Sequence, residues 1–163
     1  MPFVFATYDA AELRLCGEAF TNDILTVTQA LGENTEAWTE YVLDWFAATG
    51  PGGKAPLPGL TRSGLAHLYF VSIHPFEDGN GRIGRAISEK ALSQAIGQPS
   101  LIALSQTIQR KRSAYYDALE AANKANEVTD WLAYFAQTVL DAQSQSLTLI
   151  DFLLGKTRFH DRF

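Results

Sequence analysis

The chain has 163 residues, of which 47% are hydrophobic, and its formal net charge is -5 at pH 7. This length and apolar fraction predict a single domain over residues 1–163, and the negative charge argues against nucleic acid as a partner. The lone cysteine, Cys16, excludes an internal disulfide, and neither a secretory leader nor a membrane-spanning apolar run is evident, so we expect a cytoplasmic protein.

The first half of the chain shows helical periodicity interrupted by one loop. Residues 10–20 and 24–31 predict two short helices, and apolar side chains spaced three and four apart predict an amphipathic helix over residues 36–48. Residues 50–59 contain three of the six prolines and therefore predict a surface loop. Residues 2–8 are the best candidate for a strand.

The second half repeats the helical pattern on both sides of a glycine-rich segment. Apolar spacing predicts a helix over residues 61–74 and another that begins near residues 80–81. Residues 113–122 and 129–154 predict two more helices, after which the chain is expected to end in a frayed tail or the stump of a linker. These segments together predict an all-α fold.

Residues 74–85 combine side chains that suit phosphate chemistry. Glycines let the backbone approach an anion closely, and the helix that follows adds its partially positive N-terminus. Arg82 and Arg85 can face the loop together and bind further phosphates. Asp78 offers a hard oxygen ligand for Mg²⁺, and His74 can accept a proton from a hydroxyl nucleophile. The segment therefore predicts a site for a polyphosphate with its metal.

This segment also resembles the signature of the Fic family, which is histidine-any-phenylalanine-any-acid-glycine-asparagine-glycine-arginine-any-any-arginine. Residues 74–85 are similar to it at every fixed position. The likeness extends over roughly residues 36–154, the expected core of the domain, and matches residues 1–35 less clearly. It implies a compact helical Fic fold with a glycine-rich anion-binding loop between two helices, together with a small β-hairpin flap that holds the target.

The resemblance implies a protein adenylyltransferase that moves AMP from ATP, with Mg²⁺, onto a Ser, Thr or Tyr hydroxyl of a target protein. In that reaction His74 would deprotonate the hydroxyl, Asp78 would hold Mg²⁺, and Phe76 would anchor the loop in the core. The implied nucleotide-binding groups are Gly79, Asn80 and Gly81 for charge on the phosphate oxygens, Arg82 and Arg85 for the β- and γ-phosphates, and Tyr115 or Tyr116 near the adenine.

Three other kinds of site fit parts of the sequence. Residues 79–84 match a dinucleotide fingerprint, but a helical pattern precedes them and no acid follows about 20 residues on. His67 and His74 share a helical face, yet no third metal ligand accompanies them, so we interpret His67 as a packing or surface residue. Residues 110–116 are basic and aromatic, which in an acidic chain favours a solvated helix start over a nucleic-acid patch.

Two alternatives to AMP transfer stay open: a regulatory or interaction module that binds nucleotide without using it, and transfer of UMP, GMP or phosphocholine instead. Many Fic proteins carry an inhibitory helix in which Ser or Thr stands four residues before a glutamate, and no glutamate of this chain has that spacing. Inhibition is therefore expected to be absent, or to come from a partner in trans, an oligomer contact or an additional N-terminal region.

Overall fold

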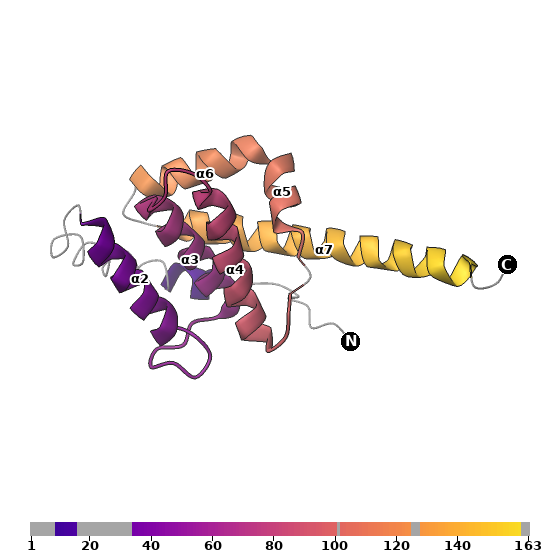
Figure 1. The fold of residues 1–163 in the computed structure, drawn as a ribbon, viewed down its shortest axis with the longest axis horizontal. Coiled ribbons are helices and arrows are strands. Elements are labelled where there is room, and N and C mark those ends of the chain that lie inside the picture. The colour runs from indigo at the N-terminus through magenta and orange to yellow at the C-terminus, as the bar shows by residue number, and fades with distance from the viewer. Residues whose placement is uncertain (1–8, 16–33, 101, 125–127, 161–163) are drawn as a thin grey trace.

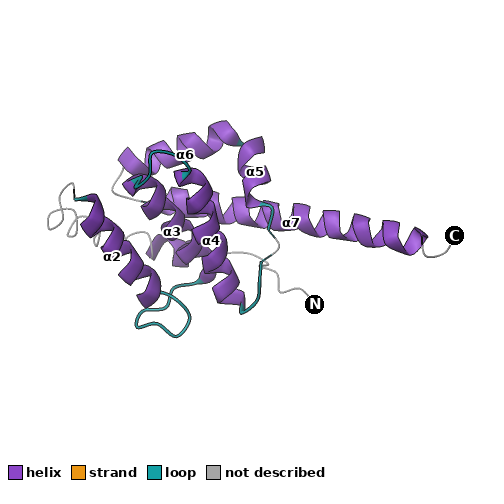
Figure 2. Ribbon diagram, in the orientation of Figure 1, coloured by secondary structure: helices purple, strands orange, loops and turns teal. Residues whose placement is uncertain are grey.

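The described part of the chain is built from helices joined by loops. The computed structural model describes residues 9–15, 34–100, 102–124 and 128–160. Its labelled helices are α2 (Thr35–Ala48), α3 (Gly59–Ile73), α4 (Asn80–Ile96), α5 (Leu104–Arg110), α6 (Arg112–Lys124) and α7 (Thr129–His160). A further helical stretch covers residues 10–15, and Figure 2 shows no strand in these ranges. The predicted all-α fold is confirmed.

Two predictions for the N-terminal region lie outside the described residues. They are the strand candidate at residues 2–8 and the helix at residues 24–31.

The helices that carry the site begin and end close to where the sequence predicts. The Asn34 side chain caps α2 by accepting a hydrogen bond from the Ala37 N–H at 3.1 Å. The α3 helix follows Pro58 and ends two residues before Pro75, which cannot continue a helix. The α4 helix ends at Gly97, whose φ of 69° is the left-handed conformation common after a helix C-terminus.

Two helical segments differ from the sequence prediction. The α5 helix was not predicted, because its seven residues are too few to show a full apolar repeat. The α7 helix continues to His160 rather than ending at residue 154, so residues 155–160, expected as a frayed tail or the stump of a linker, are helical. No proline interrupts this extension, and the Thr157 hydroxyl donates to the Leu153 carbonyl at 3.1 Å.

The centre of the fold is α3, which Figure 1 shows between α2 and α4. Every residue from Leu60 to Tyr69 is buried, and the helix packs against α2, α4 and α7. Trp131 of α7 completes this core, and its indole N–H donates to the Gly64 carbonyl at 3.0 Å. The α3 helix is thus surrounded by its neighbours and holds its C-terminal end, where the site begins, in a fixed position.

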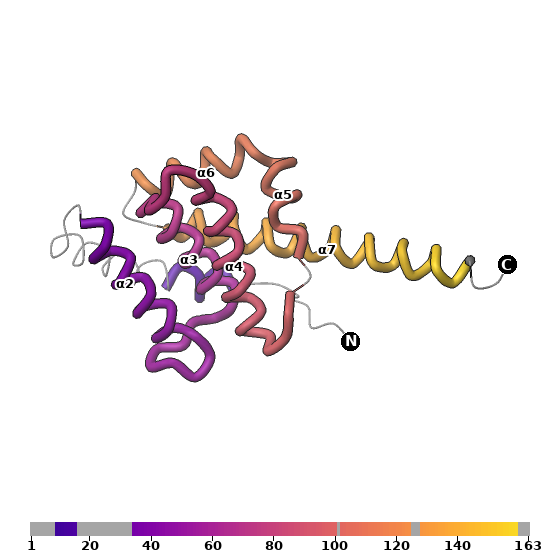
Figure 3. The backbone as a smooth tube through the Cα atoms, in the orientation of Figure 1, coloured from indigo at the N-terminus to yellow at the C-terminus, as the bar shows by residue number. Residues whose placement is uncertain are grey.

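The C-terminal part of α7 projects from the other helices, as the tube in Figure 3 shows. Residues 151–159 are all exposed. Within the described ranges, no helix has the length and apolar character required to cross a bilayer.

A buried arginine joins three helices on the side of α3 that faces α2. The Arg62 side chain is 2% exposed, and its guanidinium lies 3.8 Å from the centroid of the Phe46 ring. It donates to the Thr49 hydroxyl at 3.3 Å, to the Gln94 side-chain oxygen at 2.9 Å and to the Phe46 carbonyl at 2.7 Å. These bonds tie α2 and α4 to α3, and burial lowers the pKa of Arg62.

Candidate functional site

The loop between α3 and α4 begins with a left-handed backbone at His74. Its φ of 52° and ψ of 54° make it the one non-glycine residue with positive φ in the described part of the chain. The His74 N–H still donates to the Phe70 carbonyl at 3.2 Å, which ends α3. The chain turns away here, so the imidazole of His74 is exposed at the end of a buried helix.

The loop is held by Asn80, the first residue of α4. Asn80 is 3% exposed, and its side-chain oxygen accepts from the Phe76 N–H at 3.1 Å while its NH₂ group donates to the Phe76 carbonyl. The Phe76 ring is 50% exposed and lies 6.2 Å from the centroid of the Phe70 ring. The prediction that Phe76 anchors the loop in the core is therefore wrong. A buried amide that bonds both backbone groups of Phe76 fixes the loop more firmly than a half-exposed ring.

The N-terminus of α4 is open to a ligand. Gly79 precedes it with a φ of 88°, and no side chain caps the helix. The Ile83 N–H donates to the Gly79 carbonyl at 2.9 Å, so the N–H groups of Asn80, Gly81 and Arg82 precede the first bond of the helical ladder. An uncapped helix start with its partial positive charge favours an anion.

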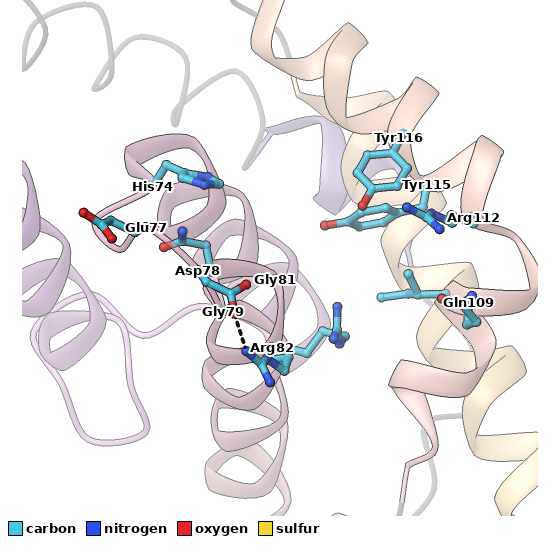
Figure 4. Close-up of a pocket in the computed structure, with 13 residues that line it drawn as sticks. His74, Glu77, Asp78, Gly79, Gly81, Arg82, Gln109, Arg112, Tyr115 and Tyr116 are labelled. Carbon is cyan, nitrogen blue, oxygen red and sulfur yellow. Dashed lines mark hydrogen bonds and ion pairs between the residues drawn. The ribbon is translucent and has the colours of Figure 1, made fainter.

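A cavity of about 390 Å³ adjoins this helix start. Figure 4 shows its two walls: the loop and α4 on one side, and side chains of α5 and α6 on the other. All the residues predicted for the site line it, namely His74, Asp78, Gly79, Asn80, Gly81, Arg82, Arg85, Tyr115 and Tyr116. Segments far apart in the sequence therefore meet around one space large enough for a small-molecule ligand.

Four further residues line the cavity and were not predicted as site residues: Glu77, Ile108, Gln109 and Arg112. The last three belong to the same wall as Tyr115 and Tyr116. Positions 108, 109, 112, 115 and 116 are spaced as one face of a helix, and only Lys111 separates α5 from α6. Helical spacing from Tyr115 and Tyr116 points back to Ile108, Gln109 and Arg112, so the sequence contains the signal that places these three residues on the same face.

Two arginines project from the first turns of α4 with different partners. The Arg82 guanidinium donates to the Asp78 carboxylate at 2.9 Å, and both side chains are strongly exposed. Arg85 Nε donates to the Ser105 hydroxyl of α5 at 3.0 Å. Arg85 is thus fixed by a neutral partner, which leaves its positive charge uncompensated by that bond.

No ion pair of Arg85 with a carboxylate occurs among the described residues. Glu89 lies one turn further along α4, and its pKa is raised by burial and lowered by the charge of Arg85. Glu18, Glu33 and Glu127 lie outside the described residues. The absence of an inhibitory glutamate accordingly stays a prediction.

The titratable groups of the described residues do not form a protein-only metal site, since no group of three or more His, Cys, Asp or Glu side chains occurs there. His67, weighed with His74 as a metal pair, is fully buried and bonds Tyr115 instead. Of the two roles expected for His67, packing or surface, the structure shows packing. Asp78 is an exposed carboxylate beside the helix start, a setting that suits Mg²⁺ held by one carboxylate, substrate phosphates and water.

Comparisons with known proteins agree with the sequence motif and the helical fold. Residues 12–92 match the model of the Fic/DOC family. The chain is similar to "Protein adenylyltransferase Fic" of Aedes aegypti, with 35% identity over 85 residues that make up 52% of this chain and 15% of the relative. It is also 36% identical over 85 residues to the protein of that name from Drosophila melanogaster, again 15% of the relative. The chain therefore belongs to the Fic/DOC family.

Proposed function

We propose that this chain transfers AMP from Mg-ATP to a Ser, Thr or Tyr hydroxyl of a target protein. The observation that carries the proposal is the single cavity that joins an exposed imidazole at the end of α3 with an uncapped helix start and two arginines on α4. The names of the relatives support the same chemistry, and the matched region is a small part of their length.

In this proposal the polyphosphate binds at the start of α4. The N–H groups of Gly81 and Arg82, with the left-handed Gly79 before them, would contact phosphate oxygens. Arg82 and Arg85 would bind the β- and γ-phosphates through their guanidinium groups. The Asn80 side chain is engaged with Phe76, so its contribution is to hold the loop rather than to contact the nucleotide.

His74 is the proposed general base. It would take the proton from the target hydroxyl as the oxygen attacks the α-phosphorus, and the bond from that phosphorus to the β-phosphate oxygen would break. AMP is then joined to the target through a phosphodiester, and pyrophosphate leaves with the charge that Arg82 and Arg85 neutralise. Asp78 would hold Mg²⁺, which when bound offsets negative charge on the phosphates.

Tyr115 and Tyr116 form the proposed wall for the adenine. Figure 4 shows both rings projecting from α6 toward the loop and α4. Their ring centroids lie 5.1 Å apart, and the Arg112 guanidinium lies 5.6 Å from the centroid of Tyr116. Flat aromatic surfaces of this kind suit stacking of a purine. Restraint of the activity by an inhibitory partner in trans is part of the proposal, because Arg85 has no carboxylate ion pair among the described residues.

The test uses ATP labelled at either the α- or the γ-phosphate, with Mg²⁺ and a cell lysate. We expect the labelling that depends on the added protein to come from the α-label alone, because the γ-phosphate leaves with pyrophosphate, whereas lysate kinases use the γ-label whether or not the protein is added. His74→Ala should abolish labelling while calorimetric ATP affinity stays within about two-fold, since the base acts on the hydroxyl and not on the nucleotide. Arg110→Ala, an exposed arginine outside the cavity that bonds Gln145, is the control.

Two outcomes would contradict AMP transfer. ATP binding without label on any protein would favour the nucleotide-binding module. Stronger labelling from UTP, GTP or CDP-choline than from ATP would instead show that another group is transferred. The same assay therefore separates the alternatives.

A further inference from the structure

A buried histidine lies behind the aromatic wall of the cavity. His67 of α3 has no exposed surface, and its Nε2 lies 2.9 Å from the hydroxyl oxygen of Tyr115 on α6. Two rings of α7 stack on the imidazole: its centroid is 5.9 Å from Trp131 at 12° and 5.2 Å from Phe135 at 30°. Nδ1 faces the backbone of Gly84, where an added Cβ would approach it to 3.2 Å. The ring is thus enclosed by aromatic side chains of α7 and by the start of α4.

This aromatic environment alone does not require a histidine. A phenyl ring would pack against Trp131 and Phe135 without the cost of removing two polar nitrogens from water. What the imidazole adds is a hydrogen bond to Tyr115, whose own side chain is 5% exposed and needs a partner for its hydroxyl. Burial lowers the pKa of His67 to about 4 and raises the pKa of Tyr115 to about 12, so both groups are neutral near pH 7.

The hydrogen bond between His67 and Tyr115 is linked to the cavity by a short series of side-chain contacts. Tyr115 lines the cavity and meets Tyr116 edge to face, with ring planes at 70°. Tyr116 is 53% exposed and lies beneath Arg112. A bond at the hydroxyl end of Tyr115 fixes the tilt of that ring, and the ring in turn limits the positions open to Tyr116.

We infer that His67 is a positioning residue for the nucleotide, which acts by holding Tyr115 as a fixed wall against the base. This inference rests on the proposed function, because it assigns the wall to nucleotide binding. His67 does not line the cavity and bonds Tyr115, so it should affect how tightly nucleotide binds and not the chemical step. Loss of the bond should therefore raise KM for ATP and leave kcat nearly unchanged.

The test compares three variants in the transfer assay and by ATP calorimetry. His67→Phe keeps a ring and loses the bond, and we expect KM and Kd for ATP to rise about five-fold, or about 1 kcal/mol, while kcat changes less than about two-fold. Tyr115→Phe removes the other partner and should give a similar rise. The double variant should show no further increase, because one bond is lost in all three.

His67→Gln is the rescue variant, since its amide reaches the position of Nε2 and can bond the Tyr115 hydroxyl. We expect it to restore most of the ATP affinity. Ser63→Ala is the control, because it removes a different buried bond between α3 and α4, that of the Ser63 and Ser88 hydroxyls at 2.6 Å, away from the cavity. It should lower the melting temperature and leave KM unchanged.

The inference is overturned if His67→Phe and Tyr115→Phe bind ATP as the wild type does, or if Ser63→Ala raises KM equally. Should His67→Phe fail to fold, Tyr115→Phe alone decides, since it retains the ring and loses one hydroxyl. Failure of the proposed function looks different: the wild type would bind ATP without labelling any protein, and the Kd values of the variants would still test the positioning role.

Discussion

Arg82 Nη2 donates to Asp78 Oδ2 across 2.9 Å, so the cation proposed for phosphate and the carboxylate proposed for Mg²⁺ neutralise one another. The two side chains are 71% and 92% exposed, and such a pair contributes less than about 1 kcal/mol. A ligand that brings phosphate and a divalent cation together offers each side chain a stronger partner. Binding of Mg-ATP should therefore exchange one ion pair for two.

Asp78→Asn tests this exchange. The wild type should bind ATP more tightly with Mg²⁺ than without it, whereas the variant should gain little from the metal because the amide is a weaker Mg²⁺ ligand. In the absence of metal the variant should bind ATP within about five-fold of the wild type, since the lost ion pair is weak. Calorimetric titrations with Mg²⁺ and with a chelator provide the measurement. An equal gain from Mg²⁺ in both proteins would show that Asp78 does not hold the metal.

Arg85 and Ser105 form a second pair that can be tested. Arg85→Ala should weaken productive ATP use by about 10- to 100-fold, the range for loss of a charge-assisted bond in a shielded site. Ser105→Ala keeps the charge and loses its anchor, the 3.0 Å bond to Arg85 Nε, so we expect a decrease of about three-fold. Transfer rate and ATP affinity are measured beside the Arg110→Ala control. Higher activity in Arg85→Ala would instead reveal an inhibitory partner of this arginine within the chain.

The buried imidazole of His67 should make stability depend on pH. Burial holds its pKa at about 4, below the 6.5 of an exposed histidine, so the unfolded chain binds the proton first. Neutral His67 therefore makes its full contribution to the free energy of unfolding above about pH 6.5. This contribution, about 3 kcal/mol in total, is lost as the pH falls toward 4. The charge of Arg85 lowers the pKa further, and Tyr115 stays protonated over this range.

Urea unfolding of the wild type and His67→Gln across this interval is the measurement. The wild type should lose stability more steeply on acidification than the variant, which has no imidazole to protonate at position 67. Carboxylates titrate in the same interval in both proteins and cancel in the difference. Parallel curves would mean that His67 is not a buried neutral group.

Gly84 and Gly81 should respond differently to an added methyl group. A Cβ on Gly84 would approach Val71 Cγ1 to 3.0 Å and His67 Nδ1 to 3.2 Å, in the tight contact between α3 and α4. We expect Gly84→Ala to cost about 1–3 kcal/mol of unfolding free energy. At Gly81 the nearest atom within reach is Arg85 Nη1 at 3.3 Å, the far end of a flexible side chain. Gly81→Ala should keep the stability of the wild type and bind ATP more weakly. The free energy of unfolding and the ATP affinity, measured for both variants, distinguish a glycine needed for helix packing from one needed for close approach of a phosphate.

The sequence predicts those parts of the molecule that depend on local pattern. Apolar spacing finds the helices of 36–48 and 61–74, and the loop proposed to bind an anion follows from residue types within one segment. The hydrogen bond of His67 to Tyr115 joins residues 48 positions apart, and no local sequence pattern predicts a contact over that separation. Asn80 shows the same limit: an amide in a phosphate-binding motif suggests a ligand contact, whereas the fold turns its side chain inward to close the loop.

The left-handed backbone at His74 has a consequence for how this family member could change over time. With φ at 52°, the position suits histidine, asparagine or glycine and disfavours β-branched residues. Codons for histidine and asparagine differ by one nucleotide, so a single mutation could replace His74 by an asparagine that keeps the loop intact. The chemistry proposed for His74 can thus be lost without loss of the fold or of the helix start proposed to bind phosphate, and a transferase would become a nucleotide-binding protein in one step.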